Sequence, residues 1–236
     1  MSANRIIVAL DLSDLDALKR LLDRLAGRAQ RFKIGKELFT ATGPASVELV
    51  HRYGGRVFLD LKFHDIPNTV AGAVRSAARL GVWMLNVHTM GGTAMMKAAR
   101  AALGEEERRP LLLGVTVLTS LGPPEWAELV GPGGRPLEAQ VAFLAERAIA
   151  CGLDGVIASP QETASLRERL GERPLIVTPG VRPRWAARDD QARVLTPTEA
   201  LRAGADYLVI GRPITAAGDP AAAMERLCEE IAGAKR

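Results

Sequence analysis

The sequence predicts an α/β protein whose single domain, residues 1–236, folds as a closed (β/α)8 TIM barrel. Three observations predict this class. Eight short apolar runs recur along the chain, segments of helical spacing lie between them, and no linker rich in proline and serine divides the sequence. Runs that are apolar throughout are typical of parallel strands covered on both faces. Single (β/α)8 barrels commonly have this length.

The eight expected strands are rich in valine, isoleucine and leucine, which suit a pleated and buried environment. A doubly wound open sheet also alternates strands with helices and is the structural alternative. Eight strands without a reversal of order favour the closed barrel. In chain order the expected strands are residues 5–12, 31–35, 56–62, 83–90, 110–118, 154–159, 174–180 and 206–213.

The segments between the expected strands each carry one apolar face, as amphipathic helices do. Ser13 or Asp14 can cap the first helix. The segments 68–81 and 93–104 each close with a glycine at a C-cap position. The apolar stripe of the first helix consists of Leu15, Leu18, Leu21, Leu22 and Leu25.

Charge and composition narrow the class of partner. Lys and Arg number 31 against 27 Asp and Glu, a net charge of +4, and the basic residues are dispersed along the chain. This pattern favours a small anionic ligand over a nucleic acid. No apolar run approaches the roughly 18 residues that span a bilayer. Cys151 and Cys228 lie far apart without CxxC or Cys/His spacing, so we expect them to be reduced thiols of a cytosolic protein. We therefore expect a cytoplasmic protein that binds neither nucleic acid nor membrane.

Polar side chains close several expected strands, at the end where (β/α)8 barrels hold their chemistry. Asp11 closes the first strand, Lys33 lies in the second, and Asp60 and Lys62 close the third. Because side chains alternate along a strand, Asp60 and Lys62 share a face. Unpaired charges would be costly to bury, but these four residues can form an alternating array of acids and bases. A structural salt-bridge cluster is the alternative, and its small net contribution to stability favours the functional interpretation.

Small and basic residues follow the seventh and eighth strands, where barrels of this class often hold phosphate. Gly211 permits close approach of the backbone, and Arg212 offers a forked pair of donors. The connection between the two strands carries Arg182 and Gln191. We expect this connection to act as a lid over an anion, with an ordinary solvated loop as the alternative.

Signatures of several other activities are missing from the sequence. It contains no GxGxxG, GxxxxGK[ST], GxSxG or HExxH motif. Its three histidines, His51, His64 and His88, are too few for a His-rich metal site. We expect His64 to support the charged strand structurally, and we assign no role to His88. The prediction is a site without a metal.

The stretch DLKFHDIPNT, residues 60–69, resembles the DxKxxD signature of the orotidine 5′-phosphate decarboxylase family, including the Ile-Pro-Asn-Thr that follows. The signature alone is shared with relatives of that family, but further matches run in order through the whole chain. They are VALD (8–11), FKIG (32–35), NVH (86–88), VTVLTS (115–120), TPGVRP (178–183), DDQARV (189–194) and VIGRPI (209–214).

The resemblance implies loss of CO2 from orotidine 5′-phosphate to give UMP, in pyrimidine biosynthesis, without a metal or an organic cofactor. It implies that Lys62 protonates C6 of the pyrimidine and that Asp60 and Asp65 hold Lys62 charged and oriented. It further implies that Lys33 pairs with these acids and contacts the ribose, and that Asp11 accepts a hydrogen bond from a ribose hydroxyl.

The resemblance also implies a homodimer with shared active sites. Asp65 and Thr69 would reach into the site of the partner subunit. The other substrate contacts that it implies are Thr119, Arg182, Gln191, Gly211 and Arg212.

Two other functions remain open at this point. A metal-dependent sugar-phosphate decarboxylase or aldolase of the same barrel superfamily would need an additional carboxylate, where the second strand offers Lys33 instead. A nucleotide or nucleic-acid binder without catalysis is the alternative from another class. It is disfavoured by the dispersed charge and by an aromatic content of 4%.

Overall fold

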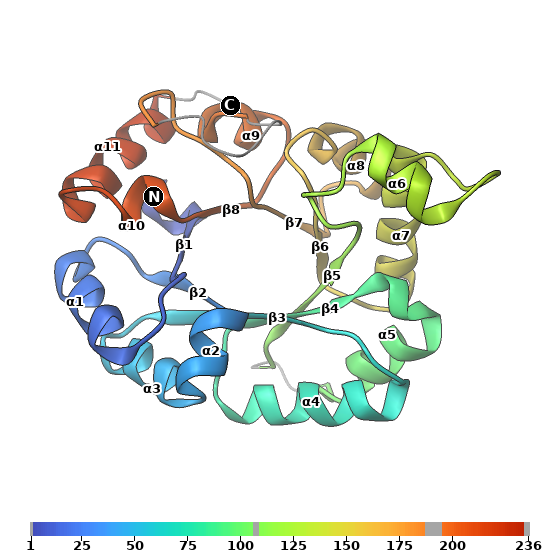
Figure 1. The fold of residues 1–236 in the computed structure, drawn as a ribbon, viewed down its shortest axis with the longest axis horizontal. Helices are drawn as coiled ribbons and strands as arrows, with labels where there is room; N and C mark the ends of the chain where they lie inside the picture. The colour runs from blue at the N-terminus through green and yellow to red at the C-terminus, as the bar shows by residue number, and fades with distance from the viewer. Residues whose placement is uncertain (1, 106–108, 187–194, 234–236) are drawn as a thin grey trace.

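The computed structural model describes residues 2–105, 109–186 and 195–233. Within these residues eight parallel strands close into a barrel in sequence order, which confirms the predicted (β/α)8 fold (Figure 1). The pairing of the first strand with the last, in which Ile7 lies opposite Val209, excludes the open sheet. The strands are β1 (Ile6–Ala9), β2 (Arg31–Gly35), β3 (Arg56–Phe63), β4 (Met84–His88), β5 (Leu111–Val115), β6 (Gly155–Ile157), β7 (Leu175–Thr178) and β8 (Tyr207–Ile210).

Most strands are shorter than predicted, because both polar and apolar positions at the predicted ends belong to the connections. The predicted strand 206–213 ends at Ile210, since Arg212 already opens a short helix. The first strand ends at Ala9, which places Asp11 in the connection that follows it.

Helices ring the outer face of the barrel (Figure 1). Among the described helices none is long and apolar enough to cross a membrane. The helical elements are η1 (Ser2–Arg5), α1 (Leu15–Leu25), α2 (Lys36–Thr42), α3 (Ala45–Arg52), α4 (Pro67–Arg79), η2 (Thr89–Gly91), α5 (Gly92–Ala101), α6 (Pro123–Val130), α7 (Leu137–Ala150), α8 (Thr163–Leu170), α9 (Pro197–Arg202), α10 (Arg212–Thr215) and α11 (Pro220–Ala232).

Local capping interactions set the ends of several helices. Asp14, rather than Ser13, is the N-cap of α1, because its Oδ1 accepts a hydrogen bond of 2.7 Å from the backbone N–H of Ala17. Just beyond the ends of α4 and α5, Gly81 and Gly104 adopt the left-handed conformation with φ of 71° and 65°. Gly81 directly follows Leu80, the C-cap of α4, close to the predicted position, whereas Gly104 lies two residues beyond Ala102, the C-cap of α5.

The core has two layers, one inside the barrel and one between the barrel and the helices. Along β1, Ile7 and Ala9 belong to the inner layer, whereas Ile6 and Val8 pack with the helices. On β3 the inner residue Phe58 precedes Asp60 by one alternation of the strand. The inner layer thus forms an apolar floor below the carboxyl ends of the strands. It comprises Ile7, Ala9, Phe58, Met84, Leu113, Val115, Ile157, Val177 and Val209.

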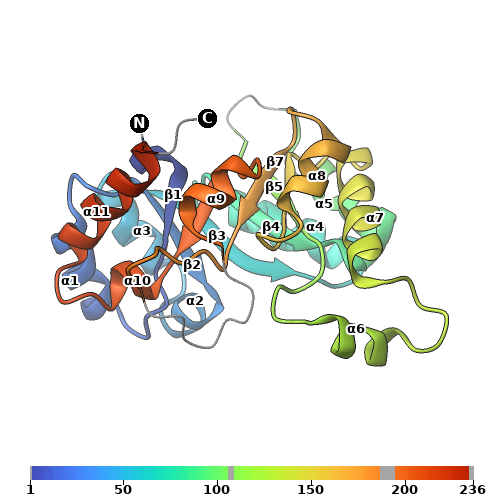
Figure 2. The ribbon, with the colours of Figure 1, turned by 90° about the horizontal axis from the view of Figure 1, so that it is seen from above.

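The connection between β5 and α7 extends away from the ring of helices and carries α6 (Figure 2). The buried side chain of Trp126 packs with the core, and its Nε1 donates a 2.8 Å hydrogen bond to the carbonyl oxygen of Arg135 within the same connection. Thr119 lies near the start of this connection, four residues after the end of β5 at the carboxyl end of the barrel.

Two carboxylates clamp neighbouring strands at the amino end of the barrel. Asp154 accepts hydrogen bonds of 2.7 Å from both terminal nitrogens of Arg109 and one of 2.8 Å from the backbone N–H of Leu112. Asp206 repeats the arrangement, with Arg167 at 2.6 Å and the N–H of Ile176 at 2.8 Å. Each clamp ties the residue before one strand to the start of the preceding strand.

Replacing Asp154 with alanine is expected to lower the free energy of unfolding by about 2–4 kcal/mol, because a largely buried guanidinium and an amide lose their acceptor. Urea denaturation measures this loss. Glu146→Ala is the matched control, since Glu146 forms a 3.4 Å ion pair with Arg169 in which both side chains are about half exposed. The control should cost less than about 1 kcal/mol, and equal losses for the two variants would contradict the assignment of Asp154.

Candidate active site

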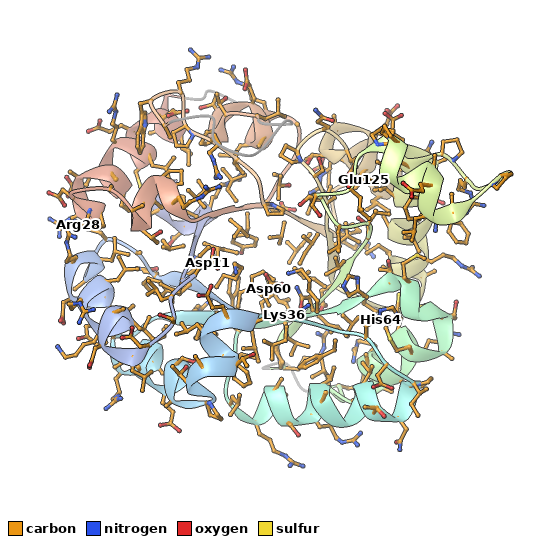
Figure 3. All side chains as sticks on the ribbon, in the orientation of Figure 1. Asp11, Arg28, Lys36, Asp60, His64 and Glu125 are labelled. Carbon is orange, nitrogen blue, oxygen red and sulfur yellow. The ribbon has the colours of Figure 1, made fainter. Side chains whose placement is uncertain are left out.

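Four charged side chains form one ion-pair network at the carboxyl end of the barrel. Lys33 Nζ lies 3.1 Å from Asp11 Oδ1 and 3.5 Å from Asp60 Oδ2. Lys62 Nζ lies 2.6 Å from Asp60 Oδ1. The labelled Asp11 and Asp60 both lie toward the middle of the ring of strands (Figure 3). The charges alternate in sign along the network, as the sequence predicts.

Burial makes this network sensitive to its internal pairing. The side chains of Lys33 and Asp60 are 12% and 10% exposed, and that of Lys62 is 25% exposed. Burial acts to raise the pKa of Asp60, but the charges of Lys33 and Lys62 and the hydrogen bonds that the carboxylate accepts outweigh it. The pKa of Asp60 therefore lies below its ordinary value, and the carboxylate is ionised at neutral pH.

The backbone of Lys62 departs from regular strand geometry. Lys62 has φ of 52° and is the sole non-glycine residue with positive φ in the part of the chain that the structure describes. The pairing of β3 with β4 shifts between Leu59 and Phe63. Strand alternation, on which the prediction for Asp60 and Lys62 depended, therefore does not hold here. The Lys62 side chain reaches Asp60 from a left-handed backbone, and such conformations are concentrated at functional sites.

Asn86 on β4 belongs to the same network, although the sequence did not single it out for a role. Its Nδ2 donates a 2.7 Å hydrogen bond to Asp60 Oδ1, and its Oδ1 accepts one of 2.8 Å from the backbone N–H of Lys62. The residue is fully buried. An amide in an otherwise apolar strand was the available signal, because a buried side-chain amide requires partners.

A cavity of about 150 Å³ opens beside the network. One wall carries the charged groups of Lys33, Asp60 and Lys62, and most of the remaining lining is apolar. Thr119 also lines the cavity, so the structure brings it to the network as expected. The other lining residues are Phe58, Val115, Val117, Leu118, Ile157, Pro179 and Val209. Such a lining suits a partly apolar ligand with a few polar groups placed near the ammonium groups.

Among the residues predicted to hold a phosphate, Gly211 lies beside the ion-pair network. Gly211 approaches Asp11, since a Cβ built on Gly211 would lie 3.5 Å from Asp11 Oδ2. Arg212 follows as the exposed first residue of α10. The N–H of Arg182 donates a 3.0 Å hydrogen bond to the carbonyl oxygen of Leu195, which brings the two ends of the connection together. Gln191 lies outside the described residues.

The other two candidates in and after the DxKxxD stretch, Asp65 and Thr69, are exposed to solvent. Asp65 is exposed, and its Oδ1 accepts a hydrogen bond of 2.6 Å from the N–H of Ile66. Thr69 is exposed in the first turn of α4. The ion-pair network of Lys62 described above does not include Asp65. Ile66 is 67% exposed, an unusual degree for an isoleucine beside a charged site.

Two histidines flank the network without joining it. The rings of His64 and His88 have centroids 5.3 Å apart, and the labelled His64 and Lys36 lie on the β3 side of the barrel mouth (Figure 3). Burial, with the nearby charges of His64, Lys36 and Lys62, lowers the pKa of His88 to about 4. His88 is therefore neutral at neutral pH. Within the described ranges no group of three or more His, Cys, Asp or Glu side chains is placed to hold a metal ion.

The chain is similar to known proteins in both sequence and structure. The model of the Orotidine 5'-phosphate decarboxylase / HUMPS family matches residues 4–227. The orotidine 5'-phosphate decarboxylase of Alkalilimnicola ehrlichii is 55% identical over 98% of this chain and 98% of its own, and that of Moorella thermoacetica is 57% identical over 97% and 92%. The crystal structure of orotidine 5'-phosphate decarboxylase from Lactobacillus acidophilus superposes with a TM-score of 0.83 at 39% identity, covering 96% of this chain and 98% of that one.

Proposed function

The chain belongs to the orotidine 5'-phosphate decarboxylase / HUMPS family, and we propose that it is a carboxy-lyase that converts orotidine 5'-phosphate to UMP and CO2 in pyrimidine biosynthesis. The relatives named above, 55% and 57% identical over nearly the whole chain, carry the decarboxylase name. The observation that carries the proposal is the largely buried ammonium of Lys62, held 2.6 Å from Asp60 beside the cavity.

The first requirement of the reaction is stabilisation of charge at C6. When the bond to the carboxylate breaks, its electron pair stays on a ring carbon that has no conventional electron sink. A fixed cation beside that carbon stabilises the transition state more than the ground state. Lys62 supplies this cation, and Asp60 keeps it charged and oriented.

The second requirement is a proton for C6. The ammonium of Lys62 donates it as CO2 departs, so that C6 gains the hydrogen of UMP and the lysine becomes a neutral amine. Solvent restores the lysine proton for the next turnover. The step consumes no oxidant or reductant, and we propose that no cofactor takes part.

Lys33 and Asp11 connect the reacting centre with the ribose. Lys33 bridges Asp11 and Asp60, so it places one cation between the carboxylate below the base and the carboxylate at the mouth. Asp11 has a side chain that is 62% exposed, and it can accept a hydrogen bond from a ribose hydroxyl. Thr119 contributes a hydroxyl to the cavity lining.

We assign the phosphate to the segment that follows β8, with Arg182 and Gln191 as further contacts. Arg212→Ala is expected to raise KM for orotidine 5'-phosphate by about 10- to 100-fold, because hydrogen bonds to charged groups are worth about 1.5–3 kcal/mol each. Affinity for uridine, which lacks the phosphate, should change by less than about two-fold. Calorimetric titration of UMP and uridine separates these effects.

The matched control for this variant is Arg173→Ala, which removes an exposed arginine near the amino end of β7. It should leave KM and both affinities unchanged. Equal losses for UMP and uridine in Arg212→Ala would count against a phosphate contact at this position.

We propose that the functional unit is a homodimer working in the cytoplasm, with the Asp65 carboxylate of one subunit completing the network around Lys62 in the other. The exposure of Asp65 and of the adjacent Ile66 supports this proposal, since both would be covered by a partner. Thr69, one turn further on, would contact the substrate of the partner.

The test of the proposed function is the loss of orotidine 5'-phosphate absorbance on mixing with the purified protein in EDTA. Turnover to UMP and CO2 in chelator is the expected result. Strict dependence on Mg²⁺ would favour the sugar-phosphate branch of the barrel superfamily, and tight UMP binding without release of CO2 would favour a binding protein. The ammonium groups of Lys33 and Lys62 already occupy both oxygens of Asp60, which supports chemistry without a metal.

A further inference from the structure

We propose that Asn86 is a positioning residue that holds the Lys62 backbone in its left-handed conformation and thereby sets where the ammonium group stands. The inference rests on the proposed function of Lys62 as the proton donor. It adds a residue on a neighbouring strand that is not among those lining the cavity and acts through Asp60 and Lys62, which are.

The register of the sheet explains why such a residue is needed. Leu59 lies opposite Leu85, and the ladder resumes where Phe63 lies opposite Val87. Three residues of β3 therefore stand against Asn86 of β4. Regular backbone hydrogen bonds cannot continue across this mismatch, because the longer segment must bulge. The side chain of Asn86 supplies the replacement.

The contacts of Asn86 use both ends of its amide. The oxygen accepts from the backbone N–H of Lys62 at 2.8 Å, and the nitrogen donates to Asp60 Oδ1 at 2.7 Å. The same carboxylate oxygen receives Lys62 Nζ at 2.6 Å. Asn86 thus fixes the lysine at its backbone directly and at its ammonium group through Asp60.

Few side chains satisfy these two contacts together. The site requires one donor and one acceptor at asparagine length, since Asn86 is fully buried and both partners are fixed. An aspartate would place a second carboxylate against Asp60, and a leucine of similar size would leave the N–H of Lys62 unpaired.

The left-handed conformation makes the hydrogen bond to Lys62 important for catalysis. Residues with a Cβ seldom adopt positive φ unless the surroundings enforce it. Without its acceptor, we expect the Lys62 segment to relax toward extended geometry, which moves the ammonium relative to C6. A displacement of about 1 Å can lower a rate by on the order of 10²-fold.

Asn86→Leu should therefore lower kcat by on the order of 10²-fold, while the dissociation constant of UMP stays within about three-fold because its ribose and phosphate contacts remain. The matched control is Thr89→Val, which removes a different fully buried hydrogen bond, the one of 2.9 Å from Thr89 Oγ1 to the carbonyl oxygen of Val115. This control should keep kcat of the folded enzyme within about two-fold. A kcat for folded Asn86→Leu within about three-fold of the unchanged protein would overturn the inference.

A second measurement reports on the backbone directly. The amide hydrogen of Lys62 should exchange slowly with solvent in the unchanged protein and in Thr89→Val, and at least about ten-fold faster in Asn86→Leu. Unchanged protection of this amide in Asn86→Leu would overturn the assignment, whatever the activity. The exchange measurement does not depend on the reaction, so it remains decisive if the proposed function fails.

Asn86→Asp keeps the shape of the residue and gives a test should the leucine variant not fold. When protonated, the new carboxyl group offers one donor and one acceptor, as the amide does; when ionised, it faces Asp60 and loses the donor. The charged groups near position 86 are Asp60 and Lys62 on β3 and Lys33 on β2, with neutral His88 on β4, while its β5 partner Leu113 is apolar.

The expected result for Asn86→Asp is a kcat that rises by at least about ten-fold, relative to the unchanged protein, as pH falls from 8 toward 5. A pH profile parallel to that of the unchanged protein would overturn the inference. If the unchanged protein itself fails to release CO2, the proposed function falls, and the exchange rate of the Lys62 amide decides the structural role of Asn86 separately.

Discussion

Lys62→Ala is expected to lower kcat by about 10⁴-fold or more, because one substitution removes both the cation beside C6 and the proton that C6 receives. Each of these contributions is worth about two or more powers of ten in enzymes that use them. Binding of UMP should remain measurable, since the ribose and phosphate contacts belong to other residues. Steady-state assays of orotidine 5'-phosphate and titration with UMP measure the two effects separately.

The matched control is Lys19→Ala, which removes an exposed lysine that pairs with Asp23 on the surface of α1. Its kcat should stay within about two-fold of the unchanged protein. A Lys62→Ala enzyme with near-normal kcat would show that another group protonates C6, and the proposed mechanism would then fail.

Mixing two inactive variants is expected to restore activity if the active site is shared between subunits. Lys62→Ala and Asp65→Ala are each expected to be almost inactive. In a heterodimer of the two, one site combines an intact Lys62 with an intact Asp65 from the other subunit. Random pairing of equal amounts makes half of the dimers mixed, each with one complete site, so about a quarter of the original activity should return.

The matched control for this experiment mixes Lys62→Ala with Asp60→Ala. These two residues contact each other within one subunit, at 2.6 Å, so no pairing of subunits can assemble a complete site. This mixture should stay inactive. Recovery in both mixtures, or in neither, would contradict a site completed by Asp65 of the partner.

The arrangement of strands could be predicted from sequence because each strand is buried on both faces and therefore reads as a continuous apolar run. Strand ends were predicted less well. Apolar character continues past the last ladder pair, as in the predicted 110–118, of which Leu111–Val115 is β5. Hydrophobicity reports burial, whereas the end of a strand depends on where backbone hydrogen bonding stops.

The charged residues of the network could be predicted from the sequence, but the backbone geometry that brings them together could not. Asp11, Lys33, Asp60 and Lys62 come together because the carboxyl ends of neighbouring strands meet at one rim. The bulge at Lys62 was missed, because no local sequence signal marks a residue with a Cβ that is forced to positive φ by its neighbours. Asn86 was missed as a site residue although its amide in an apolar strand was a signal, because its contact with the Lys62 backbone depends on a register shift between strands.

The inner apolar layer also determines from which side Lys62 regains its proton after each turnover. Phe58 and Met84, both almost fully buried, belong to the apolar layer beneath the ion pairs. In the described part of the chain this layer separates Lys62 from water at the amino end of the barrel. The neutral amine of Lys62 must then take up a proton through the same cavity opening that the nucleotide uses. In heavy water, one deuterium should therefore be incorporated per molecule of UMP. Hydrogen exchange at the Lys62 amine should be slow while UMP occupies the cavity.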